Sequence, residues 1–311
     1  MTINQTKGVY AISVTPFHDD GRIDFDGIGR LCDFYAEAGA CGLTVLGMMG
    51  EAQKLDAAEA TEVVRRFMAH SSVPVVVGVS APGFAPMQRL AQEAMTLGAA
   101  GVMLAPSASL RTDDQIVDYY ANVSDAIGRG IRFVIQDFPL AQSVMMSPAV
   151  IRRIVNDNPA CVMLKHEDWP GLDKITQLRA WQADGSLRPI SILCGNGGAF
   201  LDLEMARGAD GAMTGYAFPE MLVDVVKLSR QGELEAAMDI FDVHLPLVRY
   251  EQQPGLGLAA RKYVLHRRGV LASGAQRRPG PALSPAGKAE VELLLKRIAR
   301  RDPRADLGFV R

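Results

Sequence analysis

The sequence predicts a (β/α)8 TIM barrel of the α/β class with a C-terminal helical extension. Eight short runs of Val, Ile, Leu and Met alternate with longer amphipathic segments. Continuous apolar runs are typical of parallel strands that are covered on both faces. Residues 15–22, which follow the first run, lack the GxGxxG pattern of a dinucleotide-binding sheet, so eight strands favour a closed barrel over an open sheet.

The expected elements follow one another with short connections. We expect strands at residues 9–14, 42–46, 73–79, 101–104, 133–136, 162–165, 190–193 and 211–213. Helices are expected between them at residues 25–38, 57–70, 85–97, 114–127, 171–183 and 199–206, with another that begins at Pro148. Asp24, Asp56 and Ser147 precede three of these helices and are the expected N-caps.

After residue 213 the alternation gives way to helices alone. They are expected at residues 219–231, 234–249, 257–268 and 285–299. We therefore expect a catalytic barrel domain over residues 1–225 and a helical extension over residues 226–311. Residues 273–284 are rich in Pro, Gly and Arg, which predicts an exposed connection inside the extension.

Composition and charge argue against several classes of partner. The chain has 311 residues, of which 48% are hydrophobic, and a formal net charge of −2. Such a chain is not expected to bind nucleic acid, because it has no basic patch. No run approaches the ~18 uncharged apolar residues that a membrane helix needs. Residues 1–8 lack the apolar core of a signal peptide, so a cytoplasmic enzyme without membrane partners is expected.

The cysteines and histidines are scattered along the chain. The four cysteines form no CxxC pair, and the five histidines show no metal-ligand spacing. We therefore expect reduced, mostly buried thiols and no metal site.

Lys165 ends the sixth expected strand, directly after the apolar residues 161–164. Barrel enzymes keep their active sites at the C-terminal ends of the strands. Desolvation at such a position favours the neutral amine, which can attack a carbonyl. The alternative interpretation is a lysine that extends from the strand end towards solvent.

Glu167 follows Lys165 by two residues, so extended backbone would place both side chains on the same side. A carboxylate beside a Schiff-base lysine can relay protons during imine formation and elimination. A plain ion pair is the alternative. His166 would face the other way and pack against a helix.

Two glycine-containing turns follow expected strands, at residues 47–51 (GMMGE) and 195–198 (GNGG). The backbone N–H groups of such turns can hold an anion such as a carboxylate. Neither turn continues into the Lys-Ser/Thr of a P-loop, so no phosphate site of that kind is predicted.

Read in order, these segments resemble the dihydrodipicolinate synthase / N-acetylneuraminate lyase family. The matching positions are Thr15, Pro16 and Phe17, residues 47–51 (GTTGE or GSTGE in the family), Pro139, Lys165 and residues 208–212. The resemblance covers nearly the whole chain. It implies a lysine-dependent barrel with a C-terminal helical extension that acts on a 2-keto acid, forms a homotetramer, and needs neither a metal nor an organic cofactor.

Several positions depart from the family pattern. The two hydroxyl residues of the family loop are Met48 and Met49 here, and the tyrosine of the family's YNxP segment is Gln136. Glutamine forms hydrogen bonds but is neither an acid nor a base near neutral pH. The arginine that dihydrodipicolinate synthases carry two places after the proline is Ala141. These departures argue against dihydrodipicolinate synthase activity.

A subgroup of the family shares the departure at Gln136. Residues 134–139 and 164–167 are similar to those of L-2-keto-3-deoxyarabonate dehydratases, and so are residues 212–219. Those enzymes also carry a glutamate two residues after the lysine. The resemblance therefore implies a hydro-lyase of carbohydrate metabolism that converts a 2-keto-3-deoxy sugar acid to 2-oxoglutarate semialdehyde.

The resemblance and the chemistry together suggest three catalytic residues. Lys165 is expected to attack the C2 ketone and form the Schiff base, which acidifies the C3 protons. Glu167 is the candidate for the acid and base steps, because the tyrosine is absent. Gln136 is expected to orient the substrate or a catalytic water.

Five further residues are candidates for substrate binding. The backbone of Met48, Met49 and Gly50 is expected to hold the C1 carboxylate. Asn196 and Thr214 are candidates for contact with the distal hydroxyls, with structural roles in their turns as the alternative. Whether the two methionine side chains face the substrate stays open at this point.

Three other functions remain alternatives. A pyruvate-type aldolase of the same family would form the same enamine by carbon–carbon cleavage. A keto-acid-binding barrel without catalysis would have no reason to keep Glu167 beside Lys165. A phosphate-binding barrel lacks the basic residues and the helix-start signature.

Overall fold

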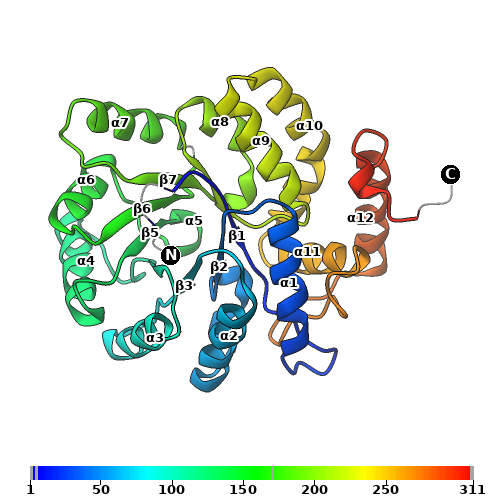
Figure 1. Ribbon diagram of the computed structural model, residues 1–311, viewed down its shortest axis with the longest axis horizontal. Coiled ribbons are helices and arrows are strands. Elements are labelled where there is room, and N and C mark those ends of the chain that lie inside the picture. The colour runs from blue at the N-terminus through cyan, green and yellow to red at the C-terminus, as the bar shows by residue number, and fades with distance from the viewer. Residues whose placement is uncertain (1–2, 4–5, 170, 309–311) are drawn as a thin grey trace.

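The computed structural model describes residues 3, 6–169 and 171–308 and is a closed barrel of eight parallel strands, ringed by helices (Figure 1). Each strand pairs with the next along the chain, and β8 pairs with β1. The strands are β1 (Gly8–Ile12), β2 (Gly42–Val45), β3 (Val75–Gly78), β4 (Gly101–Leu104), β5 (Phe133–Asp137), β6 (Cys161–His166), β7 (Ser191–Cys194) and β8 (Gly211–Thr214). The predicted fold class is confirmed.

Helices connect the strands and cover the outside of the barrel. They are α1 (Phe25–Glu37), α2 (Ala57–His70), α3 (Phe84–Thr96), α4 (Asp113–Ile127), α5 (Pro139–Gln142), α6 (Pro148–Asp157), α7 (Leu172–Ala183), α8 (Leu201–Ala206) and α9 (Pro219–Gln231). Short 3-10 turns lie at η1 (Met48–Gly50), η2 (Ala52–Lys54) and η3 (Asn196–Gly198). The sequence did not predict α5 or these turns, because each is only three or four residues long.

The three expected N-caps are confirmed. The Asp24 carboxylate accepts a hydrogen bond from the Gly27 amide, and the Ser147 hydroxyl accepts one from the Val150 amide. Asp56 forms a reciprocal capping box with Glu59. These contacts satisfy amides that have no partner within the helix, so they fix where each helix begins.

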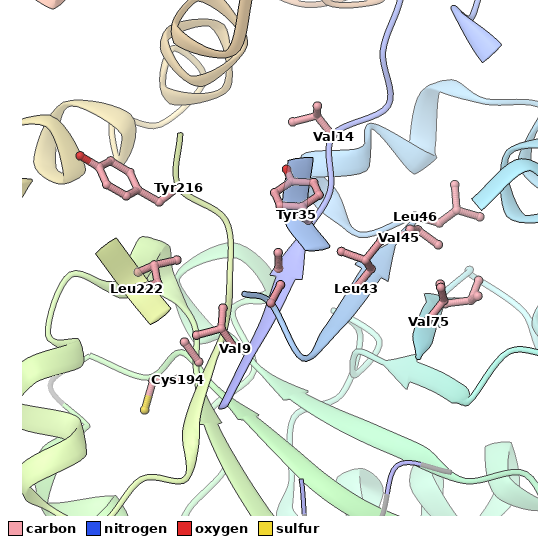
Figure 2. Packing of buried hydrophobic residues seen from close by; sticks show 14 of the residues in the cluster. Val9, Val14, Tyr35, Leu43, Val45, Leu46, Val75, Cys194, Tyr216 and Leu222 are labelled. Atoms are coloured by element: carbon pink, nitrogen blue, oxygen red, sulfur yellow. The ribbon is translucent and has the colours of Figure 1, made fainter. Parts of the chain in front are cut away.

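Alternation along the strands divides the core into two clusters. One cluster fills the interior of the barrel and includes Tyr10, Val134 and Met163. The other lies between strands and helices and includes Leu164 of the same strand as Met163. Figure 2 shows part of this outer cluster, with Val9, Leu43, Tyr35 and Leu222 among its members. Because successive side chains of a strand point to opposite faces, β6 contributes to both clusters.

The extension comprises α10 (Leu234–Glu251), α11 (Gly257–Arg267), α12 (Pro285–Ile298) and the short turn η4 (Pro303–Ala305), gathered on one side of the barrel (Figure 1). Helix α10 packs against α9, and α12 packs against α10 and α11. The expected boundary at residue 225 falls inside α9. The division into two domains therefore stays a prediction.

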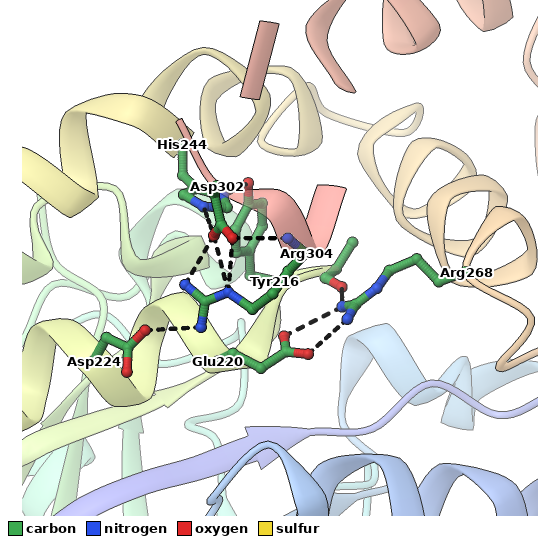
Figure 3. A network of polar contacts seen from close by, with 8 residues as sticks. Tyr216, Glu220, Asp224, His244, Arg268, Asp302 and Arg304 are labelled. Carbon is green, nitrogen blue, oxygen red and sulfur yellow. Dashed lines mark hydrogen bonds and ion pairs between the residues drawn. The ribbon is translucent and has the colours of Figure 1, made fainter. Parts of the chain in front are cut away.

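A buried polar chain attaches the end of the extension to the barrel (Figure 3). The Tyr216 hydroxyl lies 2.9 Å from His244 Nδ1, and His244 Nε2 lies 2.8 Å from an Asp302 carboxylate oxygen. Arg304 pairs with Asp302 at 2.8 Å and with Asp224 of α9 at 2.7 Å. Burial opposes the charge on Asp302, but hydrogen bonds from His244 and Arg304 lower the pKa of Asp302 below its usual range.

The connection at residues 273–284 is irregular, as expected, but much of it is half-buried and not exposed. Arg277 explains the difference. Its guanidinium pairs with Glu59, its backbone amide donates to Glu51 at 3.1 Å, and its Nε donates to the Gly21 carbonyl at 3.0 Å. The connection is therefore held against the barrel.

Three further findings concern the described residues only. No helix among them is both long enough and apolar enough to cross a membrane. No group of three or more His, Cys, Asp or Glu side chains in this part of the chain is arranged to hold a metal ion. All four cysteines are free thiols, and Cys32, Cys161 and Cys194 are buried.

We predict that Asp302→Ala lowers the free energy of unfolding by about 2 kcal/mol, because it leaves Nε2 of buried His244 without a hydrogen-bond partner. Asp224→Ala, which removes a half-exposed ion pair with Arg304, is the control and should cost less than about 1 kcal/mol. Urea unfolding measures both values, and equal losses would contradict the assignment. Since the pKa of Asp302 is lowered on folding, its contribution is present above about pH 4 and is lost as the pH falls further.

Candidate active site

Lys165 lies near the C-terminal end of β6, on the face that points into the barrel. It is two residues beyond Met163, which belongs to the interior cluster, so both side chains share this face. Its register partner on β5 is Gln136, two residues beyond the interior residue Val134. Both polar side chains are buried, with exposed fractions of 5% and 4%. They therefore lie on top of the apolar interior, at the end where barrel enzymes bind substrates.

The Glu167 carboxylate joins the residues of this site. Its Oε2 lies 2.9 Å from Lys165 Nζ and accepts a hydrogen bond of 2.7 Å from Gln136 Nε2. Its Oε1 accepts a hydrogen bond of 3.0 Å from the Asn196 amide. Glu167 is 5% exposed. Three donors from three strand ends thus hold one buried carboxylate against the lysine.

The turn after β7 is shaped to receive Glu167. A Cβ atom on Gly195 would lie 2.3 Å from Glu167 Cγ, so any side chain at this position would displace Glu167. Asn196, Gly197 and Gly198 all have positive φ angles, of 49°, 66° and 73°. This left-handed run turns the Asn196 amide towards the carboxylate. Asn196 therefore joins the site through its backbone.

This arrangement supports proton transfer at the lysine. A protonated lysine cannot attack a carbonyl, and the nearest acceptor for its proton is Glu167 Oε2. The same oxygen can return a proton to a departing hydroxyl. Gln136 fixes the carboxylate through Nε2, and its other amide atom remains to meet a substrate. The geometry is thus suited to imine formation and to elimination.

A second polar group lies behind these strands, on the side that faces the helices. Lys174 Nζ lies 2.8 Å from Asp137, 2.7 Å from Asp168 and 2.6 Å from the Met146 carbonyl oxygen. Burial raises the pKa of Asp137 to about 6, against the opposing effect of Lys174. His166 is also buried on this side, as expected, and burial lowers its pKa to about 4, so the ring is neutral at physiological pH.

The turn after β2 carries the expected carboxylate-binding residues. The Met48 side chain is 38% exposed and lines a cavity of about 700 Å³, whereas Met49 packs on the interior cluster. The Gly50 amide donates to the Gly47 carbonyl at 3.0 Å, and the Gly50 carbonyl accepts from the Thr15 hydroxyl at 2.6 Å. The Gly50 amide is therefore engaged inside the turn, which leaves the amides of Met48 and Met49 as the candidate donors.

Glu51 anchors this turn to the extension. Its carboxylate is 1% exposed and lies 2.5 Å from Lys262 Nζ of α11 and 2.7 Å from Lys54 Nζ. Burial lowers the pKa of Lys262 to about 8, and the negative charge of Glu51 opposes that shift. A left-handed backbone at Glu51, with φ of 55°, directs its side chain into this network. Helix α11 thus supports a loop of the barrel mouth.

The cavity of about 700 Å³ opens beside these residues and is lined by Met48, Met103, Ser80, Gln136 and Gln142 among others. Met48 and Gln136 therefore line the same cavity. Thr214 lies at the end of β8, is 3% exposed and is near Gly198, whose added Cβ would be 3.7 Å from Thr214 Cγ2. Its place beside the β7 turn is therefore defined, and its contact with a substrate stays a prediction.

Comparison with known proteins assigns the family. A model of the dihydrodipicolinate synthetase family matches residues 5–298. The chain belongs to this family. A solved structure of dihydrodipicolinate synthase from Rhodopseudomonas palustris is 60% identical, covers 96% of this chain and 99% of its own, and has a TM-score of 0.95. Family membership makes the chain an enzyme of the lyase and aldolase group that acts on a small molecule.

Curated members of the dihydrodipicolinate synthetase family differ in the reaction that their names state. An L-2-keto-3-deoxyarabonate dehydratase from Azospirillum brasilense is 29% identical and covers 94% of both chains. A 4-hydroxy-tetrahydrodipicolinate synthase from Chlorobium luteolum is also 29% identical, over 94% of this chain and 97% of its own. A probable 2-dehydro-3-deoxy-D-pentonate aldolase from Escherichia coli is 27% identical, over 74% and 77%. The family alone therefore does not fix the substrate.

Sequence reasoning missed two features of the site. The first is Gly195, whose requirement appears only when Glu167 packs on it. The second is the Lys174 group, which joins α7 to the ends of β5 and β6. Alternation offered a signal for the second feature, because Asp137 follows inward Gln136 and so must face the helices.

We predict that Gly195→Ala lowers kcat about 100-fold, because the added methyl group displaces Glu167 from Lys165. The protein should still fold and still form an adduct with pyruvate. Gly130→Ala is the matched control, since a Cβ there meets nothing within 4 Å. Steady-state kinetics and circular dichroism compare the two variants. A Gly195→Ala enzyme with normal kcat would contradict this role for the glycine.

Proposed function

We propose that the protein is a Schiff-base hydro-lyase that dehydrates a 2-keto-3-deoxy sugar acid, with L-2-keto-3-deoxyarabonate as the first substrate to test and 2-oxoglutarate semialdehyde as its product. The observation that carries the proposal is the Glu167 carboxylate, which lies 2.9 Å from Lys165 Nζ and is held by Gln136. A dehydratase of this kind is similar to the chain over 94% of its length, which supports the choice of substrate.

The proposed reaction begins at Lys165. The neutral amine attacks the C2 ketone, and the carbinolamine loses water to give an iminium. Glu167 accepts the lysine proton and passes it to the hydroxyl that leaves the carbinolamine as water, which restores the carboxylate. Glu167 then removes a proton from C3, which gives the enamine. The enamine expels the C4 hydroxyl, which leaves as water after it receives a proton from Glu167. The conjugated iminium left by this step loses a C5 proton and gains one at C3, and the resulting C4–C5 enol tautomerises to the aldehyde. Hydrolysis of the imine then releases 2-oxoglutarate semialdehyde and restores Lys165.

The other proposed residues bind and orient the substrate. The amides of Met48 and Met49 hold the C1 carboxylate at the turn after β2. Gln136 orients the substrate or the departing water with its free amide atom. Asn196 and Thr214, at the ends of β7 and β8, are the proposed contacts of the distal hydroxyls. We also expect a homotetramer, as is usual in the family.

An aldolase is the second candidate, because the same enamine arises when a carbon–carbon bond breaks. A family member named as a probable pentonate aldolase is 27% identical to the chain. The favoured reaction is dehydration, since a carboxylate in contact with the lysine can protonate a departing hydroxyl at C4. A dihydrodipicolinate synthase is disfavoured by Gln136 and Ala141, although a structure of that name is 60% identical.

We predict that borohydride traps a lysine adduct whose mass identifies the reaction. L- and D-2-keto-3-deoxyarabonate, 2-keto-3-deoxygluconate and pyruvate are each incubated with the enzyme, reduced, and read by intact-protein mass. The expected result is an adduct with the dehydrated mass of one sugar acid, absent from Lys165→Ala and present in the control Lys227→Ala, which changes an exposed lysine. A pyruvate-mass adduct from a sugar acid would indicate aldol cleavage, and no adduct would exclude the Schiff base.

A second prediction separates Glu167 from Gln136. Glu167→Gln should lower the dehydration rate by about 10²–10⁴, because the amide cannot transfer protons. Gln136→Leu, which removes only a hydrogen-bond donor from Glu167, should lower it less. Trapping of pyruvate should persist in both variants. A greater loss in Gln136→Leu than in Glu167→Gln would mean that Glu167 is not the proton carrier.

A further inference from the structure

A small cavity lies behind the turn that holds Glu167. Its volume is about 40 Å³, and its lining includes Gly195, Asn196, Asp168 and Glu204. Trp169 and Phe200 also line it; they are partly exposed and pack edge to face, with ring centroids 4.7 Å apart. A cavity of this size with polar groups in its wall is large enough for one water molecule, which needs about 10–15 Å³ for its centre.

Glu204 of α8 supplies a buried polar group to this cavity. Its side chain is 7% exposed, and its Oε2 has no hydrogen-bond partner among the described residues. The Cys194 thiol is hydrogen-bonded to the same carboxyl group. An unpaired buried carboxyl oxygen is costly, so a polar partner in the cavity is expected.

Among the described residues, the groups that shift the pKa of Glu204 include no positive charge. Cys194 comes from β7, Asp202 from its own helix, Glu167 from the end of β6, and Asp168 lines the same cavity. Burial, with smaller effects of Asp202 and Glu167, raises the pKa of Glu204 to about 8. At neutral pH the group is therefore a carboxylic acid, which can both donate and accept hydrogen bonds.

The cavity adjoins the backbone that positions Glu167. A Cβ on Gly195 would lie 2.3 Å from Glu167 Cγ, and the Asn196 amide donates to Glu167 Oε1. Both residues also line the cavity. The turn is a run of three left-handed residues, 196–198, so its position depends on what packs behind it.

We propose that Glu204 is a positioning residue, which binds a water in this cavity against the turn at Gly195 and Asn196 and so fixes the Glu167 carboxylate beside Lys165. The inference rests on the proposed function, because Glu167 must be the proton carrier for its position to matter. The protonated form of Glu204 is the competent one. Ionisation adds a negative charge that faces both Glu167 and Asp168, so activity falls as the pH rises through about 8.

The test measures exchange of the pyruvate methyl protons with deuterium by NMR, at pH 6–10. This exchange needs the Schiff base and a base, but no sugar acid. Glu204→Gln keeps a neutral donor and acceptor at every pH, and Glu204→Leu removes both. Asp202→Asn is the matched control, because Asp202 is a neighbouring carboxyl group that does not line the cavity.

We expect Glu204→Leu to lower kcat for exchange about tenfold with little change in KM, since a displaced base costs rate and not binding. Glu204→Gln should match the wild type at pH 7 and lose the decline above pH 8. Asp202→Asn should keep the wild-type rate at pH 7 and move the alkaline decline slightly to lower pH, because it removes a negative charge that helps to raise the pKa of Glu204. The rescue by glutamine and the altered pH profile are effects that a merely structural role would not produce.

Two outcomes would overturn the inference. One is normal exchange by Glu204→Leu, and the other is an unchanged alkaline decline in Glu204→Gln. If Glu204→Leu does not fold, the pH profile of Glu204→Gln decides alone. Borohydride trapping of pyruvate by the wild type distinguishes failure of the proposed function from failure of this inference alone. Without an adduct, the proposed function fails, and this inference fails with it. With an adduct but wild-type behaviour of both variants, only this inference fails.

Discussion

The site depends on one buried carboxylate, Glu167, which binds Lys165, Gln136 and the Asn196 amide at once. These three donors come from the ends of β6, β5 and β7, and a closed barrel brings neighbouring strand ends together. Alternation along β6 explains why the lysine and the carboxylate meet, since residues two apart share a face. The register of the barrel strands therefore decides which side chains meet at the site.

The same alternation forces a second polar layer onto the helix side of these strands. Asp137 and His166 are register partners, directly beside the inward pair Gln136 and Lys165. A buried charge there is tolerated only with a partner, and Lys174 supplies it through two ion pairs. This layer fixes the ends of β5 and β6 from behind.

Much of this structure could be predicted from the sequence. Every expected strand exists, with ends within two residues of those observed, because continuous apolar runs and N-cap residues are local signals. Lys165 and Glu167 were also accessible to sequence reasoning, since their relation is set by one strand. The fit of Gly195 against Glu167 and the proposed role of Glu204 were not, because both depend on the left-handed turn that returns the chain behind Glu167.

Gln136 and Glu167 form a coupled pair, and their coupling bears on how the family varies its chemistry. Where the family carries a tyrosine on β5, one side chain can move protons beside the lysine. Here the residue on β5 can only donate and accept hydrogen bonds, and a carboxylate on β6 lies next to the lysine. A tyrosine at position 136 would meet a carboxylate already held by two other donors. Substitutions at the two positions should therefore not be additive, because each residue sets the geometry of the other.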